Sequence, residues 1–166
     1  MKTSFEQYVA TQLAPDLAAQ VKPSVLLLTC MDYRYAHRII DVMNSAGLRR
    51  KYDTFVLAGA AAGANENEIW RKTLVEHIRT ARSIDHPIDR LIILEHRDCG
   101  AYKAFFGLDW SMVTPPVEEA RHAEEVIKLI ADLKSEFRTE IPNLKIESIL
   151  LTRDEDDALH VEIQHP

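Results

Sequence analysis

The sequence predicts an α/β protein with a mostly parallel central sheet of about four strands, an antiparallel C-terminal strand, and helices on both faces. Short aliphatic runs without polar alternation are typical of strands that are covered on both faces. Segments with helical periodicity alternate with these runs along the chain, as in parallel sheets flanked by helices. The chain has 166 residues, 46% of them hydrophobic, with no repeat or linker. We therefore expect a single domain over 1–166, large enough to bury about 70% of its unfolded surface.

Residues 1–22 are predicted to form an N-terminal helical arm. Apolar residues four apart indicate a short amphipathic helix over 4–13. These residues are Phe5, Val9 and Leu13. Pro15 interrupts this helix, and a second turn is expected at 16–20. The arm suits packing either on a partner subunit or on its own domain, and the sequence leaves both open.

The first strand and helix are predicted at Val25–Cys30 and Tyr35–Ala46, with Gly47 just after the helix end. The apolar positions assigned to the buried face of this helix are Ile39, Ile40, Val42, Met43 and Ala46. A second strand is expected at Thr54–Ala58. It leads into Gly59–Gly63, which the sequence predicts to be a loop of small residues.

The middle of the chain is predicted to hold two long helices around a third strand. Residues 65–84 show one helical stripe, made of Ile69, Trp70, Leu74, Ile78 and Ala81. The strand is Arg90–Glu95, followed by a short helix or turn over 101–107 and a loop over 108–115. The second long helix is Val117–Phe137. Its apolar period is carried by Val117, Ala120, Val126, Ile127, Ile130 and Leu133.

Two strands are expected near the C-terminus, at Ile146–Leu151 and Leu159–Ile163. The acidic segment Asp154–Asp157 between them is too short for a helical crossover. The last strand is therefore predicted to pair antiparallel with the one before it.

Composition narrows the class of partner. Twenty basic and 26 acidic residues give a net charge of −6, which argues against nucleic acid or an anionic membrane as the main partner. No segment has the roughly 20 apolar residues of a membrane span. No secretory signal is visible, so we expect a cytoplasmic protein with reduced thiols. In that setting two cysteines indicate metal binding or catalysis more than a disulfide, although the disulfide remains an alternative.

Reactive side chains follow two of the predicted strands where each ends. Cys30 closes the first strand, and His96 and Cys99 follow the third. The carboxyl ends of parallel strands meet at one edge of a sheet, where ligands bind. Thiolates and imidazole are zinc ligands, and three protein ligands leave a fourth position for water or substrate. The sequence therefore predicts a catalytic zinc site.

Asp32 and Arg34 stand next to this predicted site. Asp32 is two residues beyond Cys30, so it can either orient a zinc-bound water or bind the metal itself and close the site. A bidentate pair with Arg34 would keep the carboxylate ionised and away from the metal. We interpret both as catalytic residues, with the resting position of Asp32 left open.

Cys30-x-Asp32-x-Arg34, followed by His96-x-x-Cys99-Gly100, resembles the zinc signature of the β-class carbonic anhydrases. The resemblance implies Zn²⁺ bound by Cys30, His96 and Cys99, and an Asp32–Arg34 dyad that gates or orients the fourth ligand. It also implies a homodimer or higher homo-oligomer, with N-terminal helices packed on the partner. The implied reaction is reversible hydration of a small-molecule substrate, carbon dioxide, to bicarbonate by zinc-bound hydroxide.

Five positions differ from that family pattern. The second strand tip reads Val56-Leu57-Ala58-Gly59, where the family commonly has Arg-Asn-Ala-Gly. Glu95 replaces a glycine, Arg97 replaces a small hydroxyl residue, and Tyr33 replaces a small residue. Two alternatives therefore stay open: a carbonyl sulfide or carbon disulfide hydrolase with the same zinc site, or a metal-binding protein of this fold without carbonic anhydrase activity. His122 shows no partner pattern and is assigned no role.

Overall fold

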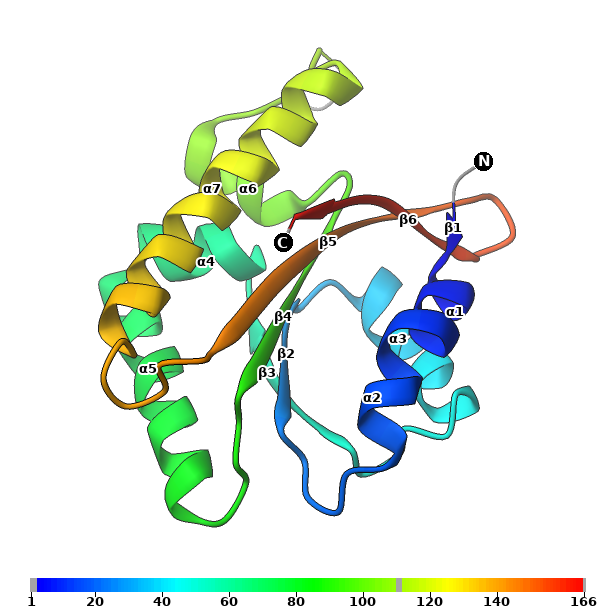
Figure 1. Cartoon of the computed structure of the whole chain (residues 1–166). Coiled ribbons are helices and arrows are strands. Elements are labelled where there is room, and N and C mark those ends of the chain that lie inside the picture. Colours follow the sequence, from blue (N-terminus) through cyan, green and yellow to red (C-terminus); the bar gives the residue numbers. More distant parts are fainter. Residues whose placement is uncertain (1–2, 110–111, 166) are drawn as a thin grey trace.

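The computed structural model describes residues 3–109 and 112–165. Its centre is a six-stranded twisted sheet with the order β1-β6-β5-β4-β2-β3 (Figure 1). The strands are β1 (Thr3–Ser4), β2 (Val25–Cys30), β3 (Tyr52–Leu57), β4 (Arg90–His96), β5 (Lys145–Arg153) and β6 (Leu159–His165). Strands β3, β2, β4 and β5 are parallel, and β6 runs antiparallel to β5. The predicted fold class and the C-terminal hairpin are confirmed.

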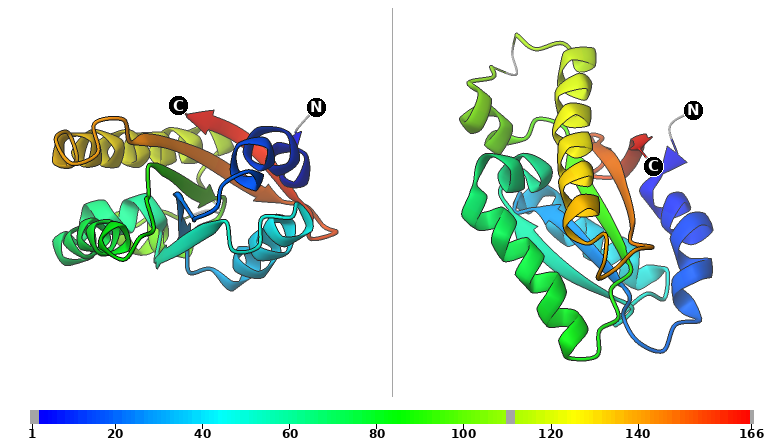
Figure 2. Two further views of the ribbon diagram at one scale, coloured as in Figure 1. Left: turned by 60° about the horizontal axis from the view of Figure 1, so that its bottom comes forward. Right: turned by 60° about the vertical axis from the view of Figure 1, so that its left-hand side comes forward.

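Helices cover both faces of this sheet, as the sequence predicts. The helical segments are α1 (Phe5–Tyr8), the π-helical turn η1 (Val9–Leu13), α2 (Ala14–Ala18), α3 (Tyr33–Ser45), α4 (Ala60–Glu66), α5 (Glu68–Ser83), α6 (Gly100–Phe106) and α7 (Pro115–Glu136). Helices α1, α2 and α3 lie on one face, and α4, α5 and α7 lie on the other (Figures 1 and 2). Among the described residues, no helix is both long and apolar enough to cross a membrane.

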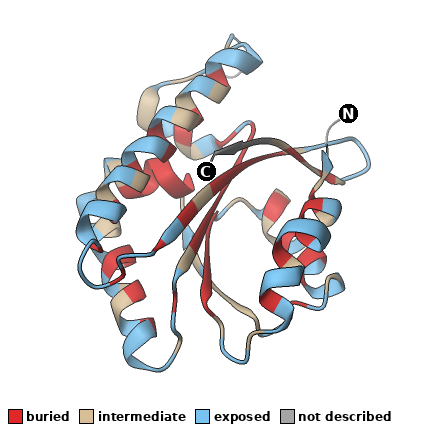
Figure 3. Ribbon diagram, in the orientation of Figure 1, coloured by how far each residue is buried: buried red, intermediate tan, exposed pale blue. Residues whose placement is uncertain are grey.

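Strand β2 lies between the two hydrophobic cores, one on each face of the sheet, and contributes side chains to both. All six of its residues are buried (Figure 3). Leu26 and Leu28 belong to the cluster shared with α4, α5 and α7, whereas Val25 and Leu27 belong to the cluster shared with α1–α3. Alternate residues of a strand point to opposite faces, so an unbroken aliphatic run fills both cores and fixes β2 in the middle.

The N-terminal arm packs on its own sheet. Phe5, Val9 and Leu13 are each no more than 1% exposed, and they join the core cluster that contains Leu159 and Val161 of β6. The expected single helix over 4–13 is wrong in detail, because the chain continues from α1 through η1 into α2 without a break. Pro15 lies in the first turn of α2, immediately after the π-helical turn, so it does not end the helical arm. The short strand β1, which pairs with β6, has no signal in the sequence.

The predicted loop Gly59–Gly63 is wrong, because these residues begin helix α4. Gly59 caps this helix with a φ of 72°, and Gly63 is packed so tightly that a Cβ there would lie 2.2 Å from the Ala58 carbonyl oxygen. The small residues are needed here because α4 packs closely against the end of β3. The same residue types are common in loops, so the composition of this segment predicts a loop.

The predicted helix over 65–84 is also wrong in its boundary. Asn67 has an extended backbone and accepts the Trp70 N–H, so it ends α4 and caps α5. Five residues assigned to buried stripes are instead exposed: Ile40, Ile69, Val117, Ala120 and Ile127. Ile40 and Ile127 follow the buried Ile39 and Val126, and at 100° per residue the buried stripe of the helix does not reach them.

Candidate metal centre

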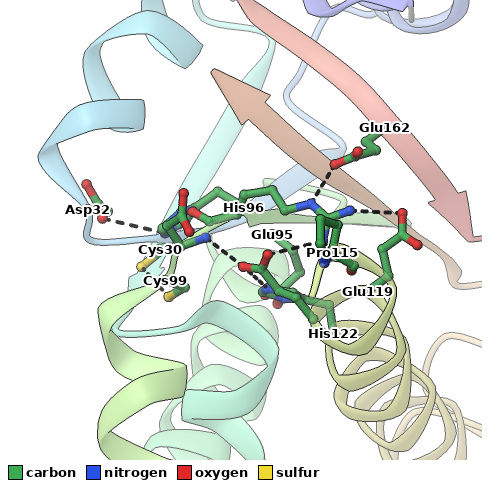
Figure 4. Close-up of polar contacts among 12 residues, drawn as sticks. Cys30, Asp32, Glu95, His96, Cys99, Pro115, Glu119, His122 and Glu162 are labelled. Carbon is green, nitrogen blue, oxygen red and sulfur yellow. Dashed lines mark hydrogen bonds and ion pairs between the residues drawn. The ribbon is translucent and has the colours of Figure 1, made fainter. Parts of the chain in front are cut away.

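Two adjacent parallel strands carry the candidate ligands to one edge of the sheet. Cys30 is the last residue of β2, His96 is the last residue of β4, and Cys99 precedes α6 (Figure 4). The three side chains are buried, with exposures of 7%, 2% and 1%. One ligand atom from each lies within 4.8 Å of the others. The structure therefore brings together the three residues that the sequence singles out as metal ligands.

The geometry of these three groups fits zinc. The two Sγ atoms are 3.8 Å apart, and two thiolates at about 2.3 Å from one ion in a tetrahedron lie about 3.8 Å apart. His96 donates its Nδ1–H to the Arg97 carbonyl oxygen at 2.8 Å, which leaves the lone pair on Nε2. That Nε2 is buried and has no hydrogen-bond partner among the described residues. A buried, unpaired nitrogen beside two thiols is a donor set that a soft divalent ion satisfies.

The surroundings of Cys30 favour its thiolate form, which is the form that binds metal. The hydrogen bond with Cys99 lowers the pKa of Cys30 to about 4, against the opposing effect of burial. The His96 imidazole and the Gly59 N–H, which donates to the Cys30 sulfur at 3.3 Å, lower this pKa further. The same hydrogen bond with Cys30, together with burial, raises the pKa of Cys99.

Asp32 and Arg34 form a close ion pair beside the ligands. Asp32 caps α3, accepting the backbone N–H of Arg34 at 2.9 Å. The Arg34 guanidinium donates to it through Nε at 2.9 and 3.1 Å and through Nη2 at 2.6 Å. These bonds hold the pKa of Asp32 below its usual range. The Asp32 carboxylate is also 3.8 Å from Nε2 of His96, so an ionised, oriented carboxylate borders the ligand set.

Apolar groups form the rest of the site wall. Cys30 and Cys99 belong to a buried cluster with Ala62 and Tyr102. Tyr35 stacks on the His96 ring with centroids 4.3 Å apart, which fixes the plane of the imidazole. These contacts exclude water on the inner side, whereas the Asp32 and Arg34 side chains keep 14% and 28% of their surface exposed. The ion-pair side is therefore the partly open one.

Directly behind the ligands lies a buried charged network that sequence reasoning missed. It consists of Glu95 and Arg97 on the β4 side and of Glu118 and His122 on α7 (Figure 4). Each of the four is at most 7% exposed. The only sequence signal is the pair of departures at 95 and 97, because a glutamate and an arginine that flank a buried strand end need buried partners.

Comparison with known proteins gives both sequence relatives and a fold. No family model matches the sequence. An uncharacterized protein of Rickettsia conorii is 31% identical over 133 residues, which cover 79% of this chain and 68% of the relative. An uncharacterized protein of Rickettsia bellii is 32% identical over 79% of this chain and 77% of its own length. The chain belongs to the family of these rickettsial proteins.

The solved structures that resemble this chain are β-carbonic anhydrases. The β-carbonic anhydrase CafD of Aspergillus fumigatus has a TM-score of 0.53 at 13% identity, covering 89% of this chain and 94% of the enzyme. A single-residue variant of the same enzyme has a TM-score of 0.54 at 13% identity, covering 98% and 99%. This chain has the β-carbonic anhydrase fold, as the resemblance of its motifs predicts.

Proposed function

We propose that this protein is a zinc-dependent enzyme that hydrates carbon dioxide reversibly to bicarbonate. The observation that carries the proposal is the unpaired, buried Nε2 of His96, which lies with two thiols beside a carboxylate held by arginine. Three protein donors leave one coordination position for a small molecule. The fold supports the proposal, since the similar solved structures are carbonic anhydrases.

The residues of this chain have separate roles in the proposed reaction. Cys30, His96 and Cys99 would hold the ion. A zinc ion in such a site acts as a Lewis acid and makes water acidic near neutral pH. Asp32 is kept ionised by Arg34, so it accepts a hydrogen bond from the attacking water and orients its lone pair toward the carbon of the substrate.

The proposed reaction balances as carbon dioxide plus water giving bicarbonate plus one proton. The new C–O bond forms from the water oxygen, and the proton leaves for solvent. The Asp32–Arg34 side of the site is the exit, because these two side chains are the partly exposed groups at its border. The apolar groups around the thiols suit a substrate without charge.

A second candidate function is hydrolysis of carbonyl sulfide or carbon disulfide at the same site. The tip of β3 favours it, because Val56 and Leu57 stand there in place of a polar pair, and Val56 is 53% exposed. An apolar tip favours a more apolar substrate. A third candidate is a metal-binding protein of this fold that no longer turns over substrate, for which the same altered tip is the reason.

We propose that the functional unit is a homodimer in the cytoplasm. Strand β3 is an edge of the sheet, and the large side chains of Met31, Tyr33 and Val56 are exposed at the tips of β2 and β3. A second copy would cover this edge and these apolar groups. The cytoplasm fits because Cys30 and Cys99 are not joined in a disulfide although their sulfur atoms are 3.8 Å apart, and an oxidising compartment would favour their pairing.

Metal analysis combined with stopped-flow assays on the protein purified under reducing conditions tests these proposals. One bound zinc with fast hydration of carbon dioxide, and no turnover of either sulfur substrate, supports the first. Turnover of a sulfur substrate without hydration supports the second, and one zinc without any turnover supports the third. Absence of bound metal would overturn all three. His96→Asn should abolish zinc binding, whereas His37→Asn, at an exposed position of α3, should leave it unchanged.

A further inference from the structure

Four ionisable side chains are buried together behind the candidate metal centre, and none of them is a candidate ligand. Glu95 and His122 are each 2% exposed, Glu118 is 6% exposed and Arg97 is 7% exposed. Removing such groups from water is costly unless they are paired and hydrogen-bonded. Glu95 and Glu118 balance Arg97 and a protonated His122 in charge, and Arg97 also pairs with Glu119 at 2.9 Å and Glu162 at 2.6 Å at the edge of the set.

One branch of this network reaches the segment that supports Cys30. His122 donates its Nδ1–H to Glu95 at 2.8 Å, and the other carboxylate oxygen of Glu95 accepts the Ala61 N–H at 2.8 Å. Ala61 lies in the first turn of α4, two residues after Gly59, whose N–H donates to the Cys30 sulfur. The side chain of Glu95 therefore ties α7 to the turn that delivers this N–H.

The other branch reaches the segment between His96 and Cys99. Glu118 accepts the Asp98 backbone N–H at 2.6 Å and pairs with the Arg97 guanidinium at 3.1 Å. Arg97 is further held by the Pro115 carbonyl oxygen at 2.7 Å. Asp98 has a positive φ of 55°, a strained conformation that persists where its surroundings hold it.

The same segment serves the metal centre with its backbone. The Arg97 carbonyl oxygen accepts the Nδ1–H of His96, and the Asp98 carbonyl oxygen accepts Nη2 of Arg34 at 3.0 Å. Side chains from α7 thus hold the 97–98 segment from behind, while its carbonyl groups orient His96 and Arg34 in front. Buried side chains thus connect α7 both to the 59–61 turn, which donates to the Cys30 sulfur, and to the 97–98 segment between His96 and Cys99.

We propose that the N-terminal half of α7 positions the metal ligands, with Glu118 and His122 as positioning residues that act through Glu95, Arg97 and the backbone of 59–61 and 97–98. The inference rests on the proposed metal centre. It explains why Glu95 and Arg97 flank His96 in place of two small residues. Glu95 bonds to His122 of α7, and Arg97 bonds to Glu118 of α7. Groups that orient metal ligands typically contribute 10–100-fold to metal affinity.

The test compares Glu118→Gln with Glu125→Gln. Glu125 is a matched control, since it is 3% exposed on the same helix, and its partners Asn65 and Arg121 lie outside 59–61 and 97–99. Zinc affinity is measured by competition with a chromophoric chelator, alongside thermal unfolding of each variant. Glu118→Gln should weaken zinc binding about 10–100-fold, and Glu125→Gln less than about threefold at a comparable loss of Tm.

Cobalt substitution separates positioning from a general loss of stability. The visible absorption bands of the cobalt-loaded protein report ligand geometry, so they should shift in Glu118→Gln and His122→Gln and stay unchanged in Glu125→Gln. Equal zinc affinities and equal cobalt spectra in the Glu118 and Glu125 variants would overturn the inference. Failure of the wild-type protein to bind zinc would instead overturn the proposed function.

Hydrogen exchange on the wild-type protein covers the case in which Glu118→Gln does not fold. The network predicts that the backbone N–H groups of Ala61 and Asp98 are protected in the metal-free protein. Protection of both amides before zinc is added supports positioning by α7. Exchange of both at the rate of an unstructured chain until zinc is added would overturn it.

Discussion

Replacement of Arg34 by alanine is the most informative perturbation of the proposed chemistry. The guanidinium makes three contacts with the Asp32 carboxylate, at 2.6, 2.9 and 3.1 Å, and one with the Asp98 carbonyl oxygen. Without it, Asp32 loses the partner that keeps it ionised and directed away from the ligand set. We predict retained zinc and slower hydration of carbon dioxide.

The size of the effect follows from the exposure of the pair. Exposed ion pairs contribute about 0–1 kcal/mol, and breaking a fully buried pair costs about 3–5 kcal/mol. With side-chain exposures of 14% for Asp32 and 28% for Arg34, the pair lies between these limits. About 2 kcal/mol of lost orientation corresponds to a roughly 30-fold fall in kcat/KM, because about 1.4 kcal/mol is tenfold.

Stopped-flow hydration of carbon dioxide measures this fall, with Arg38→Ala as the matched control. Arg38 lies one turn further along α3 and pairs with Glu6 at the protein surface, so its loss should change the rate less than about twofold. Arg34→Lys should recover part of the rate, since lysine restores the charge but not the bidentate geometry. An undiminished rate in Arg34→Ala at full zinc occupancy would refute the assigned role of the dyad.

Three further predictions concern stability. Gly63→Ala should lower the free energy of unfolding by about 3 kcal/mol, because the new Cβ would meet the Ala58 carbonyl oxygen. Gly47→Ala should cost about 1 kcal/mol, because Gly47 has a φ of 76° but open space around it. Equal losses in a denaturant titration would contradict this difference. Burial opposes a charge on His122, but Glu118 and Glu95 outweigh it and raise its pKa to about 9. The Tyr102 ring also faces the imidazole, tilted by 40° with ring centroids 4.0 Å apart. The stabilisation from His122 is therefore complete below pH 6.5 and lost as the pH rises through 9. The difference in unfolding free energy between wild type and His122→Gln should shrink by on the order of 3 kcal/mol over that window. A difference that stays constant with pH would contradict this prediction. Removal of zinc by a strong chelator should lower Tm, with about 4 kcal/mol lost relative to protein in zinc at 1,000 times the Kd; an unchanged Tm would contradict metal binding to the native state.

The sheet and the meeting of its reactive tips follow from local sequence. The run Val25–Leu28 is wholly aliphatic and every residue to Cys30 is buried, which only a strand in contact with helices on both faces can achieve. Once β2 and β4 are parallel neighbours, their ends must place Cys30 and His96 together. The Asp32–Arg34 pair is also local, since it forms within one helix cap.

Features that depend on distant partners could not be predicted in the same way. Glu95 and His122 are 27 residues apart, and each looks like an ordinary polar residue until α7 is laid against the sheet. The Gly59–Gly63 segment has the composition of a loop, and only the contact of Gly63 with the Ala58 backbone shows why the helix there needs small residues. Strand β1 is two residues long and exists because β6 offers it an edge.

X-ray absorption at the zinc K-edge of the purified protein tests the central claim most directly. If Cys30, His96 and Cys99 hold one zinc ion with an open position, the first shell contains two sulfur atoms at about 2.3 Å and two nitrogen or oxygen atoms at about 2.0–2.1 Å. A shell of nitrogen and oxygen alone, or protein isolated under reducing conditions without zinc, would contradict the account.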